Sequence, residues 1–265
     1  MVSADIRSRM SASSHAKRIM NATELCGSRR GTGLENTLVA VQDVSPGFWL
    51  WRARHAHWHP QADWGPVVTT CVVDIGDDVI LIDPMAPPDG ARDVWERLDR
   101  RPPTAVVVLK PDHVRDVGYF ARRYGARAFG PRWFFPDNRP DLPLEPVYPG
   151  MDRPGNLLAL DDGRAGGETP VWVPGARALV VADALTDQGG TLALWSTPWD
   201  EETPRRVLAR WLQLPFDVVV ISHGTRAVYD RRAYERALDQ PPWQSDELKA
   251  WLPNLARYRE LLSPT

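Results

Sequence analysis

The chain has 265 residues, a length at which one α/β domain can bury a large core. Its 32 basic and 34 acidic residues give a formal net charge of -2, which excludes the positive excess typical of proteins that bind nucleic acid or anionic lipid. Two cysteines, Cys26 and Cys71, are too few for a disulfide framework, and no apolar run has the length of a signal peptide or a membrane span. We therefore expect a cytoplasmic protein that acts on a small molecule and binds neither nucleic acid nor a membrane.

The first 35 residues are polar, small and aperiodic, a composition that buries too little surface to offset the entropy of ordering. We predict a flexible N-terminal segment over residues 1–35 and a single domain over residues 36–265. Four short β-type runs open that domain, separated by turn residues, and predict an antiparallel meander. These runs are Leu38–Val44, Phe48–Arg52, Val67–Asp74 and Val79–Asp83.

The next region alternates helical and apolar patterns. Asp89 is a candidate helix cap, and the helix that it begins is predicted to end near Leu98. The branched apolar run Ala105–Leu109 predicts a fully buried strand. A second helix is predicted from His113 to Tyr124, ended by Gly125 and followed by the short apolar run Ala126–Phe129. Prolines and glycines dominate residues 130–155, which predicts a loop.

The second half repeats this plan. Three β-type runs are followed by a helix, a buried strand and a last helix, in the order Leu157–Leu160, Thr169–Val173, Ala178–Val181, Thr203–Leu212, Phe216–Ile221 and Asp230–Leu238. The succession of meander, helices, meander and helices predicts two packed β sheets with helices outside them.

Four side chains with metal-binding chemistry lie at or just beyond the ends of apolar strands. Asp112 and His113 follow the run that ends at Leu109, Asp183 follows Ala182, and His223 follows Ser222. Loops converge at such strand ends, so these carboxylates and imidazoles could share one ion, for which zinc is favoured over iron or manganese. In such a site Asp112 would also orient the attacking water. The alternative is a structural role without a metal ion, because an aspartate at the end of a strand is often a helix cap.

Four ordered segments resemble the motifs of the metallo-β-lactamase superfamily, over roughly Leu38 to Leu238. Leu81-Ile-Asp-Pro resembles the LIDTG segment, Val107 to His113 resembles HxHxDH, Ala182-Asp-Ala-Leu resembles GDxL, and Ser222-His-Gly resembles the closing HG. The resemblance implies a four-layer αββα sandwich of the α/β class and a hydrolase site for two metal ions.

The sequence departs from these motifs at the first metal position. Val108 and Lys110 replace the two leading histidines of HxHxDH, and Glu168 stands near the place of a third. The resemblance thus leaves one metal position, with Asp112, His113 and His223 as ligands and Asp183 as the bridging carboxylate.

We hypothesise that Lys110 replaces the first cation, by neutralising Asp183 or Glu168 or by steadying an oxyanion. The alternative is a structural ion pair. Asp83 is predicted to support the ligands through hydrogen bonds, although it could equally cap a turn.

A histidine-rich loop supplies candidate substrate contacts. His55, His57 and His59 alternate and could form a metal clip, but no further ligand matches them. The resemblance implies instead that this loop overhangs the active site, with His57, Trp58 and Trp64 lining a substrate pocket. A separate arginine-rich face, Arg115, Arg122 and Arg123, is predicted to be solvated.

Two functions remain open. The first is a mononuclear zinc hydrolase of ester, lactone, amide or thioester bonds. The second is a pseudoenzyme of the same fold that binds a small molecule or a protein without turnover, and a diiron redox protein is a weaker third alternative. If the Lys110 amine filled the space among the four candidate ligands, the hydrolytic hypothesis would fail.

Overall fold

The computed structural model describes residues 39–250, apart from 61, 63, 150–153, 164–166, 198–199, 245, 247 and 248. The predicted flexible segment, residues 1–35, lies outside the described residues and stays a prediction. None of the helices within the described range combines the length and the apolar character needed to cross a bilayer.

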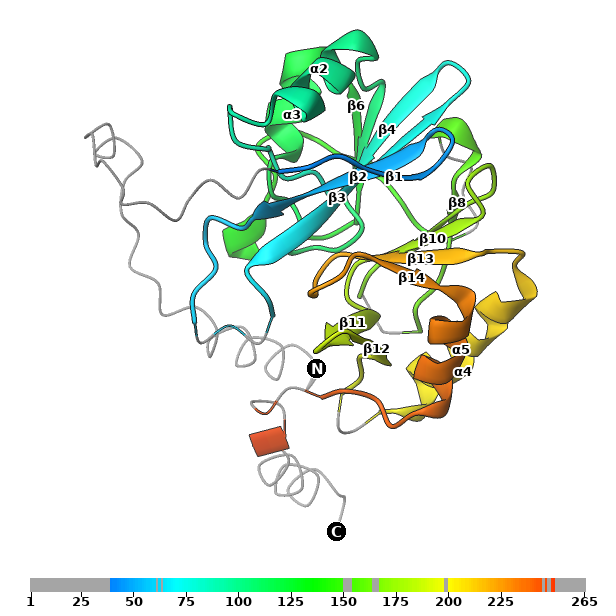
Figure 1. Ribbon diagram of the computed structural model, residues 1–265. Coiled ribbons are helices and arrows are strands. Elements are labelled where there is room, and N and C mark those ends of the chain that lie inside the picture. The colour runs from blue at the N-terminus through cyan, green and yellow to red at the C-terminus, as the bar shows by residue number, and fades with distance from the viewer. Residues whose placement is uncertain are drawn as a thin grey trace. The chain divides into compact units, whose positions relative to one another are not determined.

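The first half of the described chain forms a seven-stranded sheet in the order β1-β2-β3-β4-β5-β6-β7 (Figure 1). Its strands are β1 (Gln42–Ser45), β2 (Phe48–Arg54), β3 (Val67–Ile75), β4 (Asp78–Ile82), β5 (Ala105–Val107), β6 (Arg127–Gly130) and β7 (Glu145–Pro146). Strands β1 to β4 form the predicted antiparallel meander, whereas β4 to β7 are parallel neighbours.

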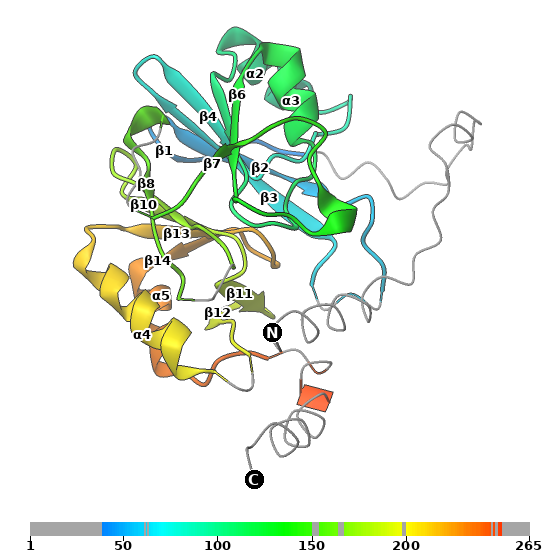
Figure 2. The same cartoon turned by 180° about the vertical axis from the view of Figure 1, so that it is seen from behind.

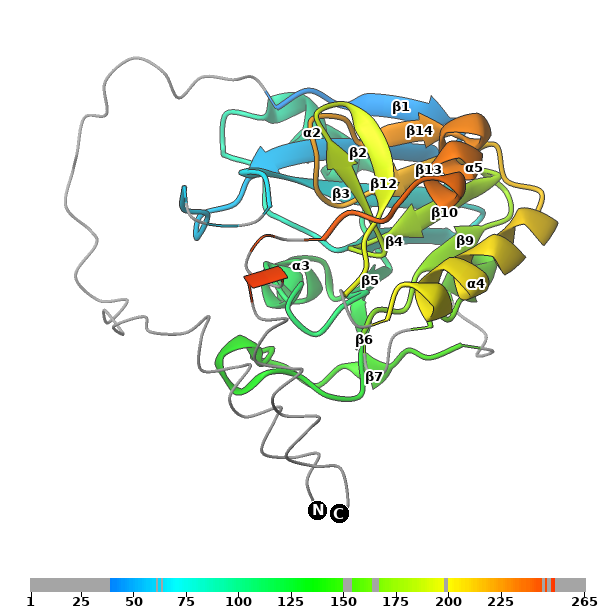
Figure 3. The same ribbon diagram turned by 90° about the horizontal axis from the view of Figure 1, so that it is seen from below.

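A five-stranded sheet in the order β14-β13-β10-β9-β8 and a separate β11–β12 hairpin make up the second half. Their strands are β8 (Leu158–Ala159), β9 (Val171–Val173), β10 (Ala178–Val181), β11 (Leu185–Gln188), β12 (Thr191–Leu194), β13 (Val218–Ile221) and β14 (Val228–Asp230). Strands β10 and β13 are parallel. The hairpin, which packs beside α5 (Figure 3), was not predicted, because its strands are short and β11 is rich in polar residues.

Helices cover the outer faces of both sheets (Figures 1 and 2). They are α2 (Arg92–Arg100) and α3 (Val117–Tyr124) on the first sheet, and α4 (Glu202–Arg210) and α5 (Arg231–Asp239) on the second. Three short 3-10 turns complete the described elements, at Pro136–Asn138, Pro154–Asn156 and Trp211–Gln213.

Alternation along the strands explains the layers. In β2, Phe48 and Leu50 point into a core between the two sheets, whereas Trp49 and Trp51 point into a second core shared with α2 and α3. In β10, Val180 joins the inner core, and its neighbours join a third core beneath α4 and α5. Because both faces of these strands are buried, their sequences are continuously apolar. The predicted four-layer αββα sandwich is confirmed.

Three local predictions are corrected. Helix α3 begins at Val117 instead of His113, because Arg115 has a φ of 42°, which a helix does not accommodate. Asp89 does not cap α2, whose cap position is Ala91 and carries no side-chain hydrogen bond. The loop over residues 130–155 contains strand β7, which extends the first sheet beside β6.

Candidate metal centre

The candidate ligands converge because their strands end at the same edge. Strands β10 and β13 are parallel neighbours, so Asp183 and His223, which follow them, emerge side by side. The two sheets meet at this edge, where the Thr69 backbone N–H donates to the Ser222 carbonyl at 2.9 Å and the Thr169 N–H donates to the Leu109 carbonyl at 2.8 Å. The segment after β5 that carries His113 is thereby held beside the ends of β10 and β13.

Three side chains form a compact ligand triangle. The Nε2 atoms of His113 and His223 are 3.3 Å apart, and the Asp183 Oδ1 atom lies 3.4 Å from His223 Nε2 and 3.6 Å from His113 Nε2. Ligands at 2.0–2.1 Å from a tetrahedral zinc ion are about 3.3–3.4 Å from one another. His113, Asp183 and His223 thus fit three corners of a tetrahedral zinc site, and within the described part of the chain their ligand atoms lie close enough together to hold one metal ion.

Asp83 orients the first of these ligands. Its Oδ2 atom lies 2.8 Å from His113 Nδ1, and its Oδ1 atom accepts the Leu109 N–H at 2.8 Å. A carboxylate that accepts the Nδ1 proton leaves the Nε2 lone pair of His113 facing the ligand triangle. Asp83 therefore contacts His113 in the supporting manner that the sequence suggested. The backbone of Asp83 has a left-handed conformation, with a φ of 48°.

His223 is suited to ligation by its protonation state. Burial is the largest influence on this imidazole and holds its pKa well below the usual value, although Asp183 opposes the shift. His223 is therefore neutral near pH 7, the form in which an imidazole binds metal. Its Nδ1 atom is buried and has no hydrogen-bond partner among the described residues.

Glu168 supports Asp183 through the backbone. Its carboxylate accepts the N–H groups of Ala182 at 3.1 Å, Asp183 at 2.5 Å and Ala184 at 2.9 Å. These bonds fix the turn that leaves β10 and carries Asp183 to the ligand triangle. Although sequence alignment puts Glu168 where the family has a histidine, the structure uses it to shape this turn.

Lys110 lies on the other side of Asp183. Its Nζ atom is 2.5 Å from Asp183 Oδ2 and 2.7 Å from Asp112 Oδ2. Burial alone would raise the pKa of both carboxyls, but the ammonium outweighs it and holds them below their ordinary range, that of Asp183 well below. The same two carboxylates outweigh burial at Lys110 and raise its pKa, so all three groups are charged at neutral pH.

This ion-pair arrangement corrects the predicted four-ligand site. Asp112 lies outside the ligand triangle, with its carboxylate bound to Lys110 and its side chain 41% exposed. The Lys110 amine thus fills the space between Asp112 and Asp183, but not the space among His113, Asp183 and His223. The hydrolytic hypothesis would fail if the Lys110 amine separated the candidate ligands from one another. The amine separates Asp112 from the other three ligands, but those three remain together.

Arg115 was predicted to lie on a solvated face and is instead directed inward. Its guanidinium donates to the carbonyls of Thr69 and Asp83 at 3.2 and 2.9 Å and to Ser222 Oγ at 2.7 Å. One side chain therefore ties β3, the end of β4 and the residue before His223. The sequence signal for this role is weak, since an arginine two residues after His113 looks like any first-turn helix residue.

A cavity of about 420 Å³ opens over the ligand triangle. Of the predicted pocket residues, Trp64 lines it, with its ring 5.1 Å from the His223 ring, whereas His57 and Trp58 are not among its lining residues. His55 takes the place expected for His57, and its ring is 5.0 Å from Trp64. Because histidines alternate along this loop, the sequence pattern does not distinguish His55 from His57 as the residue that lines the cavity.

Two further tryptophans line the same cavity, Trp195 and Trp243. They are paired by a parallel β-bridge, in which the Trp243 N–H donates to the Leu194 carbonyl at 2.7 Å. Trp195 is recognisable in the sequence as a loop tryptophan, but nothing in the sequence connects Trp243 with the site.

Comparison with known proteins identifies the fold. No family model and no curated protein matches the sequence. Among solved structures, the metallo-β-lactamase FIM-1 from Pseudomonas aeruginosa, in its mono-zinc form, is 16% identical, with a TM-score of 0.55 over 76% of this chain and 95% of that chain.

Two further metallo-β-lactamases are similar. The one from Pontibacter korlensis is 17% identical, with a TM-score of 0.55 over 77% of this chain and 100% of that chain. The one from Erythrobacter litoralis is 14% identical, with a TM-score of 0.51 over 77% and 92%. At these identities the match concerns the fold, and the chain has the metallo-β-lactamase fold.

Proposed function

We propose that this chain of metallo-β-lactamase fold is a hydrolase with one zinc ion, held by His113, Asp183 and His223, and that it cleaves an ester, lactone, amide or thioester bond. The observation that carries the proposal is the ligand triangle, whose sides of 3.3, 3.4 and 3.6 Å suit one zinc ion. The mono-zinc form of the Pseudomonas aeruginosa enzyme supports a count of one ion.

The donor set suits hydrolysis of a carbonyl compound. When bound, zinc would act as a Lewis acid toward the substrate carbonyl and favour ionisation of water. His113 and His223 are held for this purpose by Asp83 and by the meeting of the two sheets. The cavity of about 420 Å³, which is lined in part by Trp64, Trp195 and Trp243, has room for a small molecule.

Lys110 and Asp112 contribute charge at the mouth of the cavity. Asp112 is ionised and partly exposed, so it can orient a water molecule and accept its proton. Lys110 neutralises Asp183 on the side away from the histidines, where the resemblance puts the first metal ion. A fixed ammonium at this place can also stabilise the negative charge that develops on a carbonyl oxygen.

The Lys110 contacts favour a second candidate, a pseudoenzyme. An ammonium between Asp112 and Asp183 compensates both carboxylates without any metal ion, so the fold could keep this cavity for binding alone. Metal content separates the two candidates. The hydrolase requires about one equivalent of zinc, whereas metal-free protein with an intact fold supports the pseudoenzyme.

The test combines metal analysis with turnover. We expect the purified chain to retain zinc, and the single variants His113→Ala and His223→Ala to lose it. The matched control is His59→Ala, which removes an imidazole from outside the cavity and should leave the zinc content unchanged. Hydrolysis of a panel of esters, lactones, amides and thioesters should be abolished by Asp112→Asn. Zinc that persists in both ligand variants would overturn the proposed site.

Lys110→His tests whether the ammonium replaces a cation. The variant restores an imidazole ligand at the first metal position, so zinc content should rise above about one equivalent or the turnover should change. If neither quantity changes, Lys110 is a structural ion-pair partner and the replacement hypothesis is wrong.

A further inference from the structure

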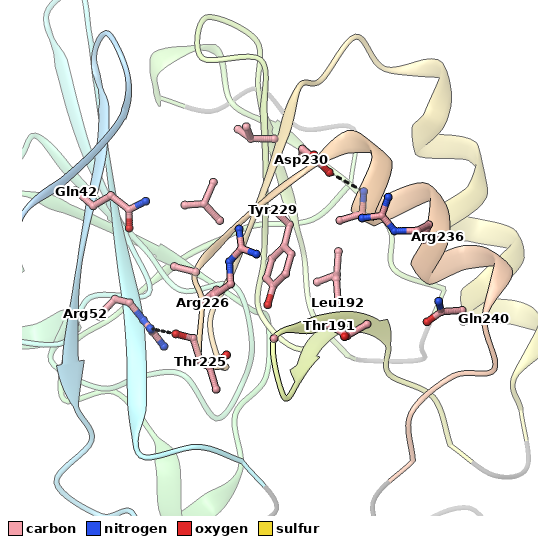
Figure 4. A pocket seen from close by; sticks show the side chains of 15 residues that line it. Gln42, Arg52, Thr191, Leu192, Thr225, Arg226, Tyr229, Asp230, Arg236 and Gln240 are labelled. Atoms are coloured by element: carbon pink, nitrogen blue, oxygen red, sulfur yellow. Dashed lines mark hydrogen bonds between the residues drawn. The ribbon is translucent and has the colours of Figure 1, made fainter.

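A second cavity, separate from the candidate metal centre, lies against β14, α5 and the β11–β12 hairpin (Figure 4). Its volume of about 710 Å³ lies within the range of small-molecule sites in proteins. The loop after β13 divides the two cavities, because His223 lines the first and Thr225 and Arg226 line the second.

The walls of this cavity carry an excess of positive charge. Arg52, Arg226 and Arg236 line it, and the carboxylate among its lining residues belongs to Asp230. That carboxylate is engaged, because Asp230 Oδ1 accepts the Ala233 N–H at 2.7 Å and caps α5. Within the described part of the chain, neither Arg226 nor Arg236 forms an ion pair. The three guanidinium groups therefore outnumber the carboxylates among the residues that line the cavity.

Arg52 is the most enclosed of the three. Its guanidinium donates to the Thr225 carbonyl at 2.8 Å and to the Gly224 carbonyl, and its Nε is buried with no partner among the described residues. Carbonyl oxygens satisfy donors but do not neutralise the charge. Burial is the largest influence and lowers the pKa of Arg52, although the nearby Asp187 carboxylate opposes this shift. A ligand anion nearby would stabilise this group.

Arg226 and Arg236 are exposed lining residues whose guanidinium groups can bind oxyanions. The Arg226 guanidinium carbon lies 5.0 Å from the centre of the Tyr229 ring, and this residue is exposed. Arg236 belongs to α5, on the other side of Tyr229 from Arg52 in the view of Figure 4. Gln42 and Gln240 add neutral amide groups to the lining.

We propose that this second cavity binds a small oxyanion carrying two or more negative charges, with Arg226 and Arg236 as its main contacts and Arg52 supplying charge from the β2 side. Phosphate groups are tetrahedral and carboxylate groups are planar, but both present two oxygens that the edge of a guanidinium group binds through two parallel hydrogen bonds. Because Arg226 and Arg236 lie on opposite sides of Tyr229 in the view of Figure 4, a ligand needs two such groups to contact both of them.

Isothermal titration calorimetry of the full chain at constant low ionic strength tests the proposal, with inorganic pyrophosphate and citrate as probes. We expect saturable binding of at least one anion at a single site. Arg226→Gln and Arg236→Gln should each weaken it about tenfold, the effect of removing a charge-assisted contact. Both side chains are exposed, so these variants should keep the native circular dichroism.

The matched control is Arg132→Gln. Arg132 is also exposed and stacks on a tyrosine, Tyr148, at 4.2 Å, but it is not among the lining residues of the cavity. Wild-type affinity in this variant, together with the losses above, supports the site, and the more tightly bound probe shows whether phosphate or carboxylate is preferred. Absence of binding, equal losses in the control, or loss of binding in His113→Ala would overturn the proposal.

Discussion

At the scale of single residues, the candidate centre depends on carboxylates that differ in what they contact. Asp183 faces the histidines with one oxygen and Lys110 with the other. Asp83 uses both oxygens to orient His113 and the backbone of Leu109. Glu168 accepts the backbone N–H groups of Ala182, Asp183 and Ala184. One carboxylate is thus left to ligate, and the others hold the ligand-bearing segments in place.

Asp83→Asn is the prediction that belongs to this scale. The amide keeps the shape of the side chain but replaces the carboxylate oxygen that faces His113 Nδ1 and fixes the tautomer of this imidazole. We expect zinc affinity to fall by about 10- to 100-fold, measured by competition with a chromogenic chelator. Asp43→Asn, which removes the exposed partner of Arg97, is the control with unchanged affinity. Equal affinities in the two variants would contradict the orienting role.

At the scale of elements, Asp187 links the β11–β12 hairpin to the loop that follows His223. Its Oδ2 atom accepts the Thr225 hydroxyl at 2.6 Å and the Arg226 N–H at 2.8 Å, and its Oδ1 atom accepts the Gly190 N–H at 2.5 Å. Gly224 permits this close approach, because a Cβ there would lie 2.3 Å from the Asp187 Cβ. The hairpin therefore holds the loop that follows His223 and so stabilises the position of this histidine.

Asp187→Asn should lower the stability of the fold in a pH-dependent way. Burial alone would raise the pKa of Asp187, but the hydrogen bonds from Thr225 and its neighbours outweigh this and lower it. The carboxylate therefore contributes stability above the unfolded pKa of about 3.9, and this contribution is lost as the pH falls through the lower folded pKa.

Urea unfolding at several pH values measures this effect. At pH 7 we expect the free energy of unfolding to fall by about 1–3 kcal/mol in Asp187→Asn. The difference from the wild type should narrow once the pH falls below about 4. A difference that is constant between pH 7 and pH 3 would show that the charge of Asp187 does not contribute.

At the scale of the whole molecule, the candidate ligands come from segments that only the folded sandwich brings together. His113 follows β5 of the first sheet, whereas Asp183 and His223 follow strands of the second. An unfolded chain cannot present this triangle, so a bound ion stabilises the native state alone.

Zinc should therefore raise the melting temperature. Free zinc at about 100 times its dissociation constant adds about 2.7 kcal/mol, which corresponds to roughly 5–10 °C for a domain of this size. Differential scanning calorimetry of the metal-free protein with and without zinc measures the shift. The His113→Ala and His223→Ala variants should show none, and an equal shift in them would place the ion elsewhere.

Much of the fold could be predicted from local patterns, because each buried strand has its own apolar run. The β2 and β10 runs and the αL cap of α3 at Gly125 are of this kind. Irregular backbone was less predictable. The left-handed backbone conformation of Arg115 moves the start of α3 toward the C-terminus. The β11–β12 hairpin has no alternating apolar pattern, since its packing depends on α5 and on Asp187.

The sequence by itself determined the layer order and which polar side chains stand at strand ends, since both follow from hydrophobic periodicity along short segments. The tertiary structure alone decided which of those side chains meet. It joined His113, Asp183 and His223, paired Asp112 with Lys110, and turned Arg115 inward. The physical reason is that ligation and ion pairing depend on distances of a few ångströms between residues far apart in the chain, which local patterns do not encode.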